Sequence, residues 1–169
     1  MKKIAMFIAF KGFRDEEYIE PKKALEAAGH AVTTVSTSRG TAQGKFRLTA
    51  QVDKLVGEID PEDYDAVTLV GGPGALGELD NAAVHGIFRK AAGLGKVIGA
   101  ICISPVVLAH AGLLKGKKAT CFPDGAEALK EGGADYTEAD LQIDGKFITA
   151  DGPVPARKYG AALAELLSV

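Results

Sequence analysis

The chain has 169 residues and 47% hydrophobic side chains, which fits a single globular domain, residues 1–169, with a sizeable core. Its 20 basic and 22 acidic residues are well mixed, so neither a nucleic-acid-binding stripe nor a polybasic membrane-binding block is expected. Two cysteines are too few for a disulfide framework, and we expect a reducing, cytoplasmic location. The first apolar run, Ile4–Phe10, is too short for a signal peptide or a membrane helix.

Continuous apolar runs in the first half of the chain are typical of strands that are covered on both faces. These predicted strands are Ile4–Phe10, Ala31–Val35 and Ala66–Val70. A helix is expected over Glu16–Ala28, with Pro21 in its first turn, because a proline deeper in a helix removes a hydrogen bond. This placement puts Glu17 at or just before the N-terminus of the helix.

The segment 37–60 is less regular, and we predict short strands or a hairpin at Phe46–Thr49 and Val52–Ile59. Beyond it, Asp80 is predicted to cap a helix. Ser104 followed by Pro105 is a second helix start, with a capping hydroxyl before a proline at the first helical position. The remaining predicted elements are strands at Val97–Ile101, Lys118–Cys121 and Phe147–Ala150, and a final helix whose apolar face runs from Ala156 to Leu167. Alternating strands and helices predict an α/β fold with a doubly wound, mostly parallel sheet.

Cys102 is the leading functional candidate, because ligands of such sheets bind beyond the carboxyl ends of the strands. The predicted strand runs to Ile101 and helix signals begin at Ser104, so Cys102 must form a sharp nucleophile elbow. The N-terminus of the following helix is expected to favour the thiolate, the nucleophilic form of the side chain. The alternative interpretation is a small buried hydrophobic residue.

The turn Gly71-Gly72 follows a neighbouring strand and is expected at the same edge, where its backbone N–H groups face charge that develops near the sulfur. Residues 72–77 also match the dinucleotide-binding fingerprint formally. The next helix is predicted only after Asp80, and no acidic residue ends the following strand. A tight turn or an oxyanion loop is therefore favoured over nucleotide binding.

Few other side chains are placed to assist Cys102. His85 lies one turn into its helix and is a minor candidate for a catalytic base, although a helix-surface position is favoured. Cys121 is predicted to end a strand on the same edge and is a minor candidate for resolving an oxidised Cys102, although a buried structural thiol is favoured. Without a Cys-x-x-Cys motif or a histidine pair, no metal and no cofactor are expected.

Five segments together resemble the ThiJ/PfpI family, which includes the Parkinson-disease-associated protein and the PfpI-type intracellular peptidases. They are Glu17–Pro21, Val70–Gly74, Ala100–Pro105, Lys117–Pro123 and Asp144–Pro153, and the resemblance covers nearly the whole chain. It implies a flavodoxin-like sandwich that is usually dimeric.

The resemblance also implies a site. Cys102 corresponds to the reactive cysteine, Glu17 to a carboxylic acid that contacts the sulfur, and Gly72 and Ile103 to the donors of backbone N–H groups. From the local sequence alone, Glu17 is interpreted as a solvated carboxylate at a helix start, like its neighbours Asp15 and Glu16. Family activities are glyoxalase action without metal or glutathione, deglycation, peptidase or amidase action, and oxidative-stress sensing with chaperone-like protection.

The chain departs from the family pattern at several positions. Ile103 stands where peptidase-like members have histidine, and Ser104 replaces the glycine that closes the elbow. Phe122 occupies a position that sometimes holds histidine, and Asp151 one that is often arginine. The missing histidine weakens the peptidase interpretation, and the missing arginine argues against a strongly anionic substrate.

The leading expectation is therefore an enzyme for a small reactive carbonyl compound, such as methylglyoxal, or for its glycated adducts. Cys102 would be its nucleophile and Glu17 its proton carrier. The alternatives are a redox sensor or chaperone that uses Cys102 oxidation, and a PfpI-like cysteine peptidase or amidase. A homodimer or higher homo-oligomer is also expected, with a hint in the apolar segment 10–19, which contains Phe10, Phe13, Tyr18 and Ile19.

Overall fold

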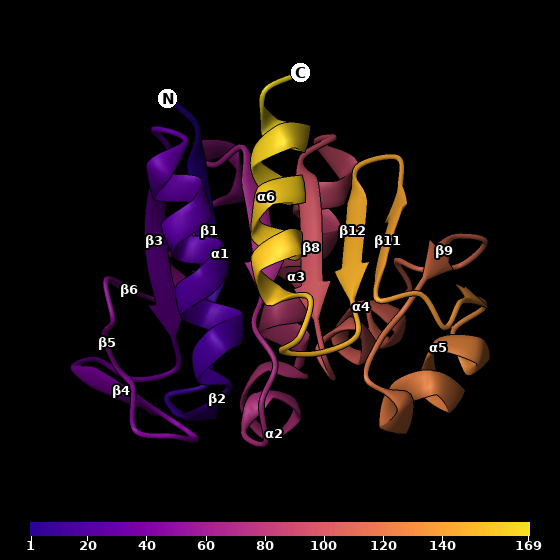
Figure 1. Cartoon of the computed structure of the whole chain (residues 1–169), viewed down its shortest axis with the longest axis horizontal. Helices are drawn as coiled ribbons and strands as arrows, with labels where there is room; N and C mark the ends of the chain where they lie inside the picture. The colour runs from indigo at the N-terminus through magenta and orange to yellow at the C-terminus, as the bar shows by residue number, and fades with distance from the viewer.

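The computed structural model describes residues 1–169 and is built around a seven-stranded sheet of order β11–β12–β8–β7–β1–β3–β6 (Figure 1). Its strands are β1 (Lys3–Phe7), β3 (Ala31–Ser36), β6 (Lys54–Leu55), β7 (Ala66–Leu69), β8 (Val97–Ile101), β11 (Leu141–Asp144) and β12 (Phe147–Ala150). All neighbours pair in parallel except β11 with β12. The predicted doubly wound, mostly parallel sheet is confirmed.

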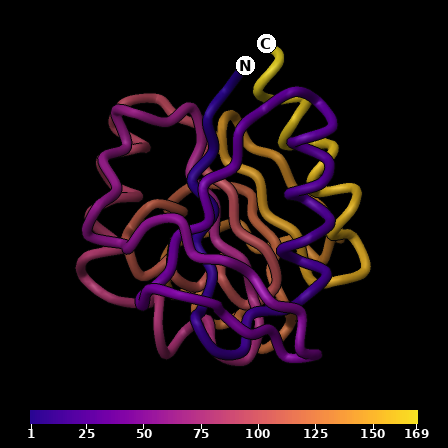
Figure 2. The backbone as a smooth tube through the Cα atoms, turned by 90° about the vertical axis from the view of Figure 1, so that its left-hand side faces the viewer, coloured from indigo at the N-terminus to yellow at the C-terminus, as the bar shows by residue number.

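Helices cover both faces of this sheet, which gives the expected flavodoxin-like sandwich (Figure 2). On one face lie α1 (Asp15–Ala27) and α6 (Ala156–Leu167), and on the other lie α3 (Ala82–Gly93) and α4 (Pro105–His110). Two short helices are α2 (Ala75–Leu79) and α5 (Ala126–Glu131). None of the helices combines the length and the apolar character that a membrane crossing requires. Both termini lie at the edge of the sheet opposite to the glycine turn and α2 (Figure 1).

Helix α1 begins earlier than predicted, at Asp15, so Pro21 lies inside the helix rather than in its first turn. Glu17 is consequently the third residue of the helix. In this first turn, the positive end of the helix dipole stabilises a carboxylate. Helix α1 meets α6 closely at this proline, since a Cβ on Gly160 would lie only 2.6 Å from the Pro21 Cα atom. The prediction from Pro21 was wrong because tertiary packing outweighs the one helix bond that proline removes.

The segment 37–60 contains a hairpin, but its strands are not the predicted ones. Strands β4 (Thr41–Gly44) and β5 (Thr49–Gln51) pair antiparallel, and β2 (Lys11–Phe13) pairs with β4 to complete a second, three-stranded sheet. The predicted strand at 46–49 is mainly the hairpin turn, in which Arg47 has a positive φ of 71°. The predicted strand at 52–59 shortens to β6 and a 3-10 turn at Val56–Glu58; another 3-10 turn follows at Pro61–Asp63.

Two further boundaries differ from the prediction. A short helix, α2 (Ala75–Leu79), follows the glycine turn directly, and Asp80 ends it. The cap of α3 is instead Asn81, whose side-chain oxygen accepts the Val84 N–H. Strand β9 (Lys118–Ala119) is shorter than predicted and pairs with β10 (Asp135–Tyr136) outside the main sheet. Cys121 therefore follows a strand of a separate sheet, two residues beyond its end and just before a 3-10 turn at Pro123–Gly125.

The apolar segment 10–19 belongs largely to the core. Phe13 and Tyr18 are buried, and their rings meet edge to face with centroids 5.3 Å apart. The apolar residues that hinted at a homodimer are thus explained by packing within the chain. The homodimer stays a prediction that rests on the family resemblance.

Candidate active site

Cys102 directly follows β8 and adopts a φ of 65°, a left-handed conformation that non-glycine residues rarely use. Its N–H donates to the Ala150 carbonyl oxygen (2.8 Å), and its own carbonyl oxygen accepts the Phe122 N–H (2.6 Å). These two bonds fix the backbone on both sides of the turn and maintain the strained conformation. The predicted sharp elbow between β8 and α4 is confirmed.

The Ser104 side chain secures this elbow in a way that the sequence did not indicate. Its hydroxyl makes no capping bond to α4 and instead donates to the carbonyl oxygen of Val70, at 2.6 Å. Ser104 is fully buried. The predicted capping role is wrong, because the first N–H groups of α4 lie in a turn that bonds to its own backbone. The hydroxyl instead ties the elbow to the end of β7.

Two backbone N–H groups point at the Cys102 sulfur, those of Gly72 and Ile103, and both lower the pKa of the thiol. Gly72 has a φ of 116°, and a Cβ at this position would lie 2.5 Å from the Gly12 carbonyl oxygen. Only glycine fits this position. The two donors assigned through the family resemblance therefore face the sulfur, as an oxyanion site requires.

Glu17 lies behind the sulfur, away from solvent. Its side chain is fully buried, and its carboxyl group faces the Cys102 thiol and the Gly71 N–H, although neither contact has full hydrogen-bond geometry. A Cβ on Gly71 would lie 2.5 Å from Glu17 Oε1 and 2.6 Å from Cys102 Cβ, so the carboxyl group and the cysteine approach the same glycine. Glu17 is thus a buried acid beside the thiol rather than a solvated carboxylate at a helix start.

The two acids of this pair have strongly shifted pKa values. Burial raises the pKa of Glu17 to about 7, against the opposing effects of the Cys102 thiol and the positive charge of Arg14. Burial and the negative charge of Glu17 raise the pKa of Cys102 to about 12. The Ile103 N–H before α4 does lower the pKa of the thiol, but burial and the adjacent carboxylate outweigh it, so the net shift is opposite to the one expected. Near neutral pH Glu17 therefore exchanges between its ionised and protonated forms beside a protonated thiol, and its ionised form can act as a base toward that thiol.

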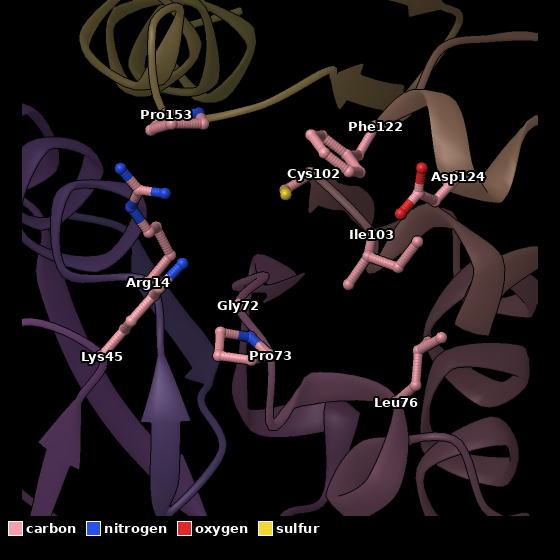
Figure 3. Close-up of a pocket in the computed structure, with 10 residues that line it drawn as sticks. All are labelled: Arg14, Lys45, Gly72, Pro73, Leu76, Cys102, Ile103, Phe122, Asp124 and Pro153. Atoms are coloured by element: carbon pink, nitrogen blue, oxygen red, sulfur yellow. The ribbon is translucent and has the colours of Figure 1, made fainter.

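A cavity of about 280 Å³ opens in front of the sulfur (Figure 3). Its walls are formed by Arg14, Lys45, Gly72, Pro73, Leu76, Cys102, Ile103, Phe122, Asp124 and Pro153. This volume lies at the small end of the range for ligand pockets. Glu17 is fully buried and does not line the cavity.

The minor candidates lie outside this cavity. His85 Nε2 and His110 Nδ1 lie 2.7 Å from the two different carboxylate oxygens of Asp80. The Asp80 side chain thus links α3, which carries His85, to α4, which carries His110. Cys121 is buried next to Phe122, and burial raises the pKa of its thiol to about 12. No group of three His, Cys, Asp or Glu side chains is arranged to hold a metal ion. The geometry thus supports Glu17, rather than His85, as the proton carrier for Cys102.

Sequence reasoning missed two cationic side chains of the cavity wall, Arg14 and Lys45. Arg14 caps α1, and Lys45 begins the turn between β4 and β5. No local motif marks either residue, because the bonds that place the hairpin turn against α1 join residues more than 30 positions apart.

Comparisons with known proteins agree with this architecture. A family model described as the DJ-1/PfpI family matches residues 2–166. The protein MJ0967 of Methanocaldococcus jannaschii is 42% identical over 161 residues, which cover 94% of this chain and 78% of that protein. Deglycase PH1704 of Pyrococcus horikoshii is 32% identical over 154 residues, covering 91% of this chain and 92% of that protein.

A solved structure shows the same fold. The crystal structure of a ThiJ/PfpI domain protein from Brachyspira murdochii superimposes with a TM-score of 0.95 at 30% sequence identity. The match covers 98% of this chain and 96% of that chain. The sheet, both helical layers and the connections between them are therefore shared along the whole length.

Proposed function

This chain belongs to the DJ-1/PfpI family, and from this premise we propose that it is a cysteine-dependent enzyme for small reactive carbonyl compounds or their adducts. One arrangement carries the proposal: a strained Cys102 whose sulfur faces the N–H groups of Gly72 and Ile103, with the buried Glu17 beside it. The relative PH1704, which bears the name deglycase, gives independent support.

The geometry suggests how the first step proceeds. An ionised Glu17 takes the thiol proton as the Cys102 sulfur adds to the carbonyl carbon. A carbon–sulfur bond forms while the π electrons of the carbonyl group move to its oxygen. The Gly72 and Ile103 N–H groups stabilise this charge, and Glu17 returns the proton to the oxygen, which gives a hemithioacetal.

A 2-oxoaldehyde can then be converted without an oxidant. If Glu17 removes the proton of the former aldehyde carbon while the ketone oxygen takes up a proton, the hemithioacetal becomes an enediol. Return of the proton from Glu17 to the former ketone carbon, with loss of the hydroxyl proton on the carbon that carries sulfur, then gives a 2-hydroxy thioester. Water hydrolyses this thioester to a 2-hydroxy acid and restores the thiol. The small cavity fits a substrate of this size, and the high pKa of Glu17 suits a group that both accepts and donates protons near neutral pH.

A redox sensor is the second candidate, and one specific observation favours it. The Glu17 carboxyl group is buried against Cys102 and makes no hydrogen bond of full geometry. If peroxide adds oxygen to Cys102, a protonated Glu17 can donate a hydrogen bond to the oxidised sulfur group, and this bond would stabilise it. In this case Cys102 would be oxidised by dilute peroxide but would turn over no carbonyl compound.

A substrate panel tests these functions. Steady-state turnover is measured with methylglyoxal, a glycated thiol and an unstructured peptide, for the unchanged protein and for Cys102→Ala and Cys121→Ala. We expect carbonyl turnover that is lost in Cys102→Ala and kept in Cys121→Ala. Turnover that persists in Cys102→Ala overturns the cysteine mechanism. Peptide cleavage without carbonyl turnover would identify a peptidase, and Cys102 oxidation without any turnover would identify the sensor.

A further inference from the structure

The wall of the cavity carries a concentrated positive charge on one side. The Arg14 and Lys45 side chains line the cavity opposite to Asp124, with the Cys102 sulfur between the two sides (Figure 3). Arg14 forms an ion pair with Glu16 through Nε at 2.6 Å, and its two terminal amino groups keep free N–H donors, whereas Lys45 forms no ion pair at all. One unpaired cation, Lys45, and the free donors of Arg14 therefore line the space in front of the nucleophile.

The backbones of these two residues are anchored to the site. The Arg14 N–H donates to the Gly71 carbonyl oxygen (2.9 Å), and the Lys45 N–H donates to the Phe13 carbonyl oxygen (2.8 Å). The Asp15 carboxylate, which is buried, accepts the N–H groups of Phe46 (3.0 Å) and Leu48 (2.9 Å). These bonds clamp the β4–β5 turn onto the start of α1, so the relative position of the two cations is set by the fold.

The side chains are also held, by the ring of Phe46. This ring is 58% exposed, and it lies 4.9 Å from Arg14 Cζ and 5.4 Å from Lys45 Nζ. Cation–π contacts with this ring restrain both charged side chains, which also line the cavity.

We infer that the substrate of Cys102 carries an anionic group, a carboxylate or a phosphate, a few atoms from its reactive carbonyl carbon. This inference rests on the proposed function and names its substrate class. Arg14 and Lys45 would bind the anion while the carbonyl group faces Gly72 and Ile103. Asp124, on the other side, would repel the anion and so fix the orientation of the substrate.

The inference reverses the expectation drawn from Asp151. Asp151 lines a separate, neighbouring cavity together with Asp140, and it is not among the residues around Cys102. The acidic residue at the position that is often arginine therefore does not set the charge in front of the sulfur. Arg14 and Lys45 do, from a part of the chain that the family motifs do not cover.

Alkylation of Cys102 tests the charge preference without relying on turnover. The rate with iodoacetate, an anion, is divided by the rate with neutral iodoacetamide; each reagent forms a carbon–sulfur bond and releases iodide. We expect this ratio to fall about fivefold in Lys45→Gln, because the anionic reagent loses one exposed charge contact that the neutral reagent never makes. It should not change in Lys96→Gln, which removes a lysine that lines a different cavity. Lys45 is the better choice for the test, because Arg14 also lowers the pKa of Glu17.

Turnover gives the second arm and separates the two sources of negative charge. Methylglyoxal is compared with 4,5-dioxopentanoate, which carries a carboxylate, and with hydroxypyruvaldehyde phosphate. We expect at least one anionic compound to have the higher kcat/KM, and its advantage over methylglyoxal to shrink in Lys45→Gln. An alkylation ratio that is the same in Lys45→Gln as in the unchanged protein overturns the inference. A charge-dependent ratio without turnover of any carbonyl compound overturns the proposed enzyme and leaves the anion preference standing.

Discussion

The Ser104 hydroxyl donates a buried 2.6 Å hydrogen bond to the carbonyl oxygen of Val70, and this bond joins the elbow after β8 to the glycine turn after β7. The bond therefore fixes the distance between the two backbone segments that face the Cys102 sulfur.

Ser104→Ala should lower the free energy of unfolding by about 1–3 kcal/mol, because the Val70 carbonyl group would be left buried without its partner. The measurement is urea-induced unfolding. Ser168→Ala is a matched control, since its hydroxyl bonds to the Glu165 carbonyl oxygen at the exposed end of α6 and should cost much less. Equal losses in the two variants would mean that the Ser104 bond contributes nothing specific to the elbow.

Gly71→Ala should disable the site. The added Cβ would lie 2.5 Å from Glu17 Oε1 and 2.6 Å from Cys102 Cβ, so the carboxyl group and the nucleophile must separate. We expect carbonyl turnover to fall by roughly 100-fold, as for a 1 Å misplacement of reacting groups. Gly77→Ala is the control, because nothing lies within 4 Å of a Cβ there and α2 should keep its structure. Near-normal turnover in Gly71→Ala would show that Glu17 and Cys102 need not be in contact.

Much of the fold follows from local patterns, and so does the position of Cys102. A continuous apolar run that ends at Ile101, directly before the helix signals at Ser104 and Pro105, leaves no room for a loop, and the positive φ of Cys102 is the result. Gly72 was placed by the same reasoning, because parallel strands end at one edge.

What the sequence did not predict depends on contacts between distant residues. Pro21 was assigned to the first turn of α1 because proline removes a helix bond, whereas it lies inside the helix, where α1 packs against Gly160 of α6. Asp15 was read as solvated, whereas it is buried and bonds to the turn that carries Lys45. The contact of Glu17 with Cys102 was available only through the family resemblance, because a carboxylate in the first turn of a helix is ordinary on local grounds.

Stability should depend on pH through Glu17. Its pKa is raised from 4.5 to about 7 in the folded protein, so the folded state binds the proton more tightly than the unfolded chain. The stabilisation is fully present below the unfolded pKa and is lost as the pH rises through the folded pKa. Between pH 4.5 and 8 the unfolding free energy should fall by about 3 kcal/mol relative to Glu17→Gln, which does not titrate. Urea unfolding at a series of pH values measures this difference, and parallel profiles for the two proteins would show that Glu17 keeps an ordinary pKa.

Glu17→Gln should affect the reactivity of Cys102 and catalysis in opposite directions. The charge of Glu17 raises the pKa of the thiol, and a neutral amide removes this repulsion, so the thiol pKa should fall and alkylation by iodoacetamide at pH 7.5 should become faster. Turnover should nevertheless fall by about 100-fold or more, because an amide cannot carry a proton between sulfur and substrate oxygen. Glu20→Gln, which removes another carboxylate of α1, serves as the control for both measurements. Mass spectrometry should place the first alkylation on Cys102, which lines the cavity, and not on the buried Cys121. Slower alkylation in Glu17→Gln would show that Glu17 activates the thiol rather than restraining it, and unchanged turnover would remove Glu17 from the proton path.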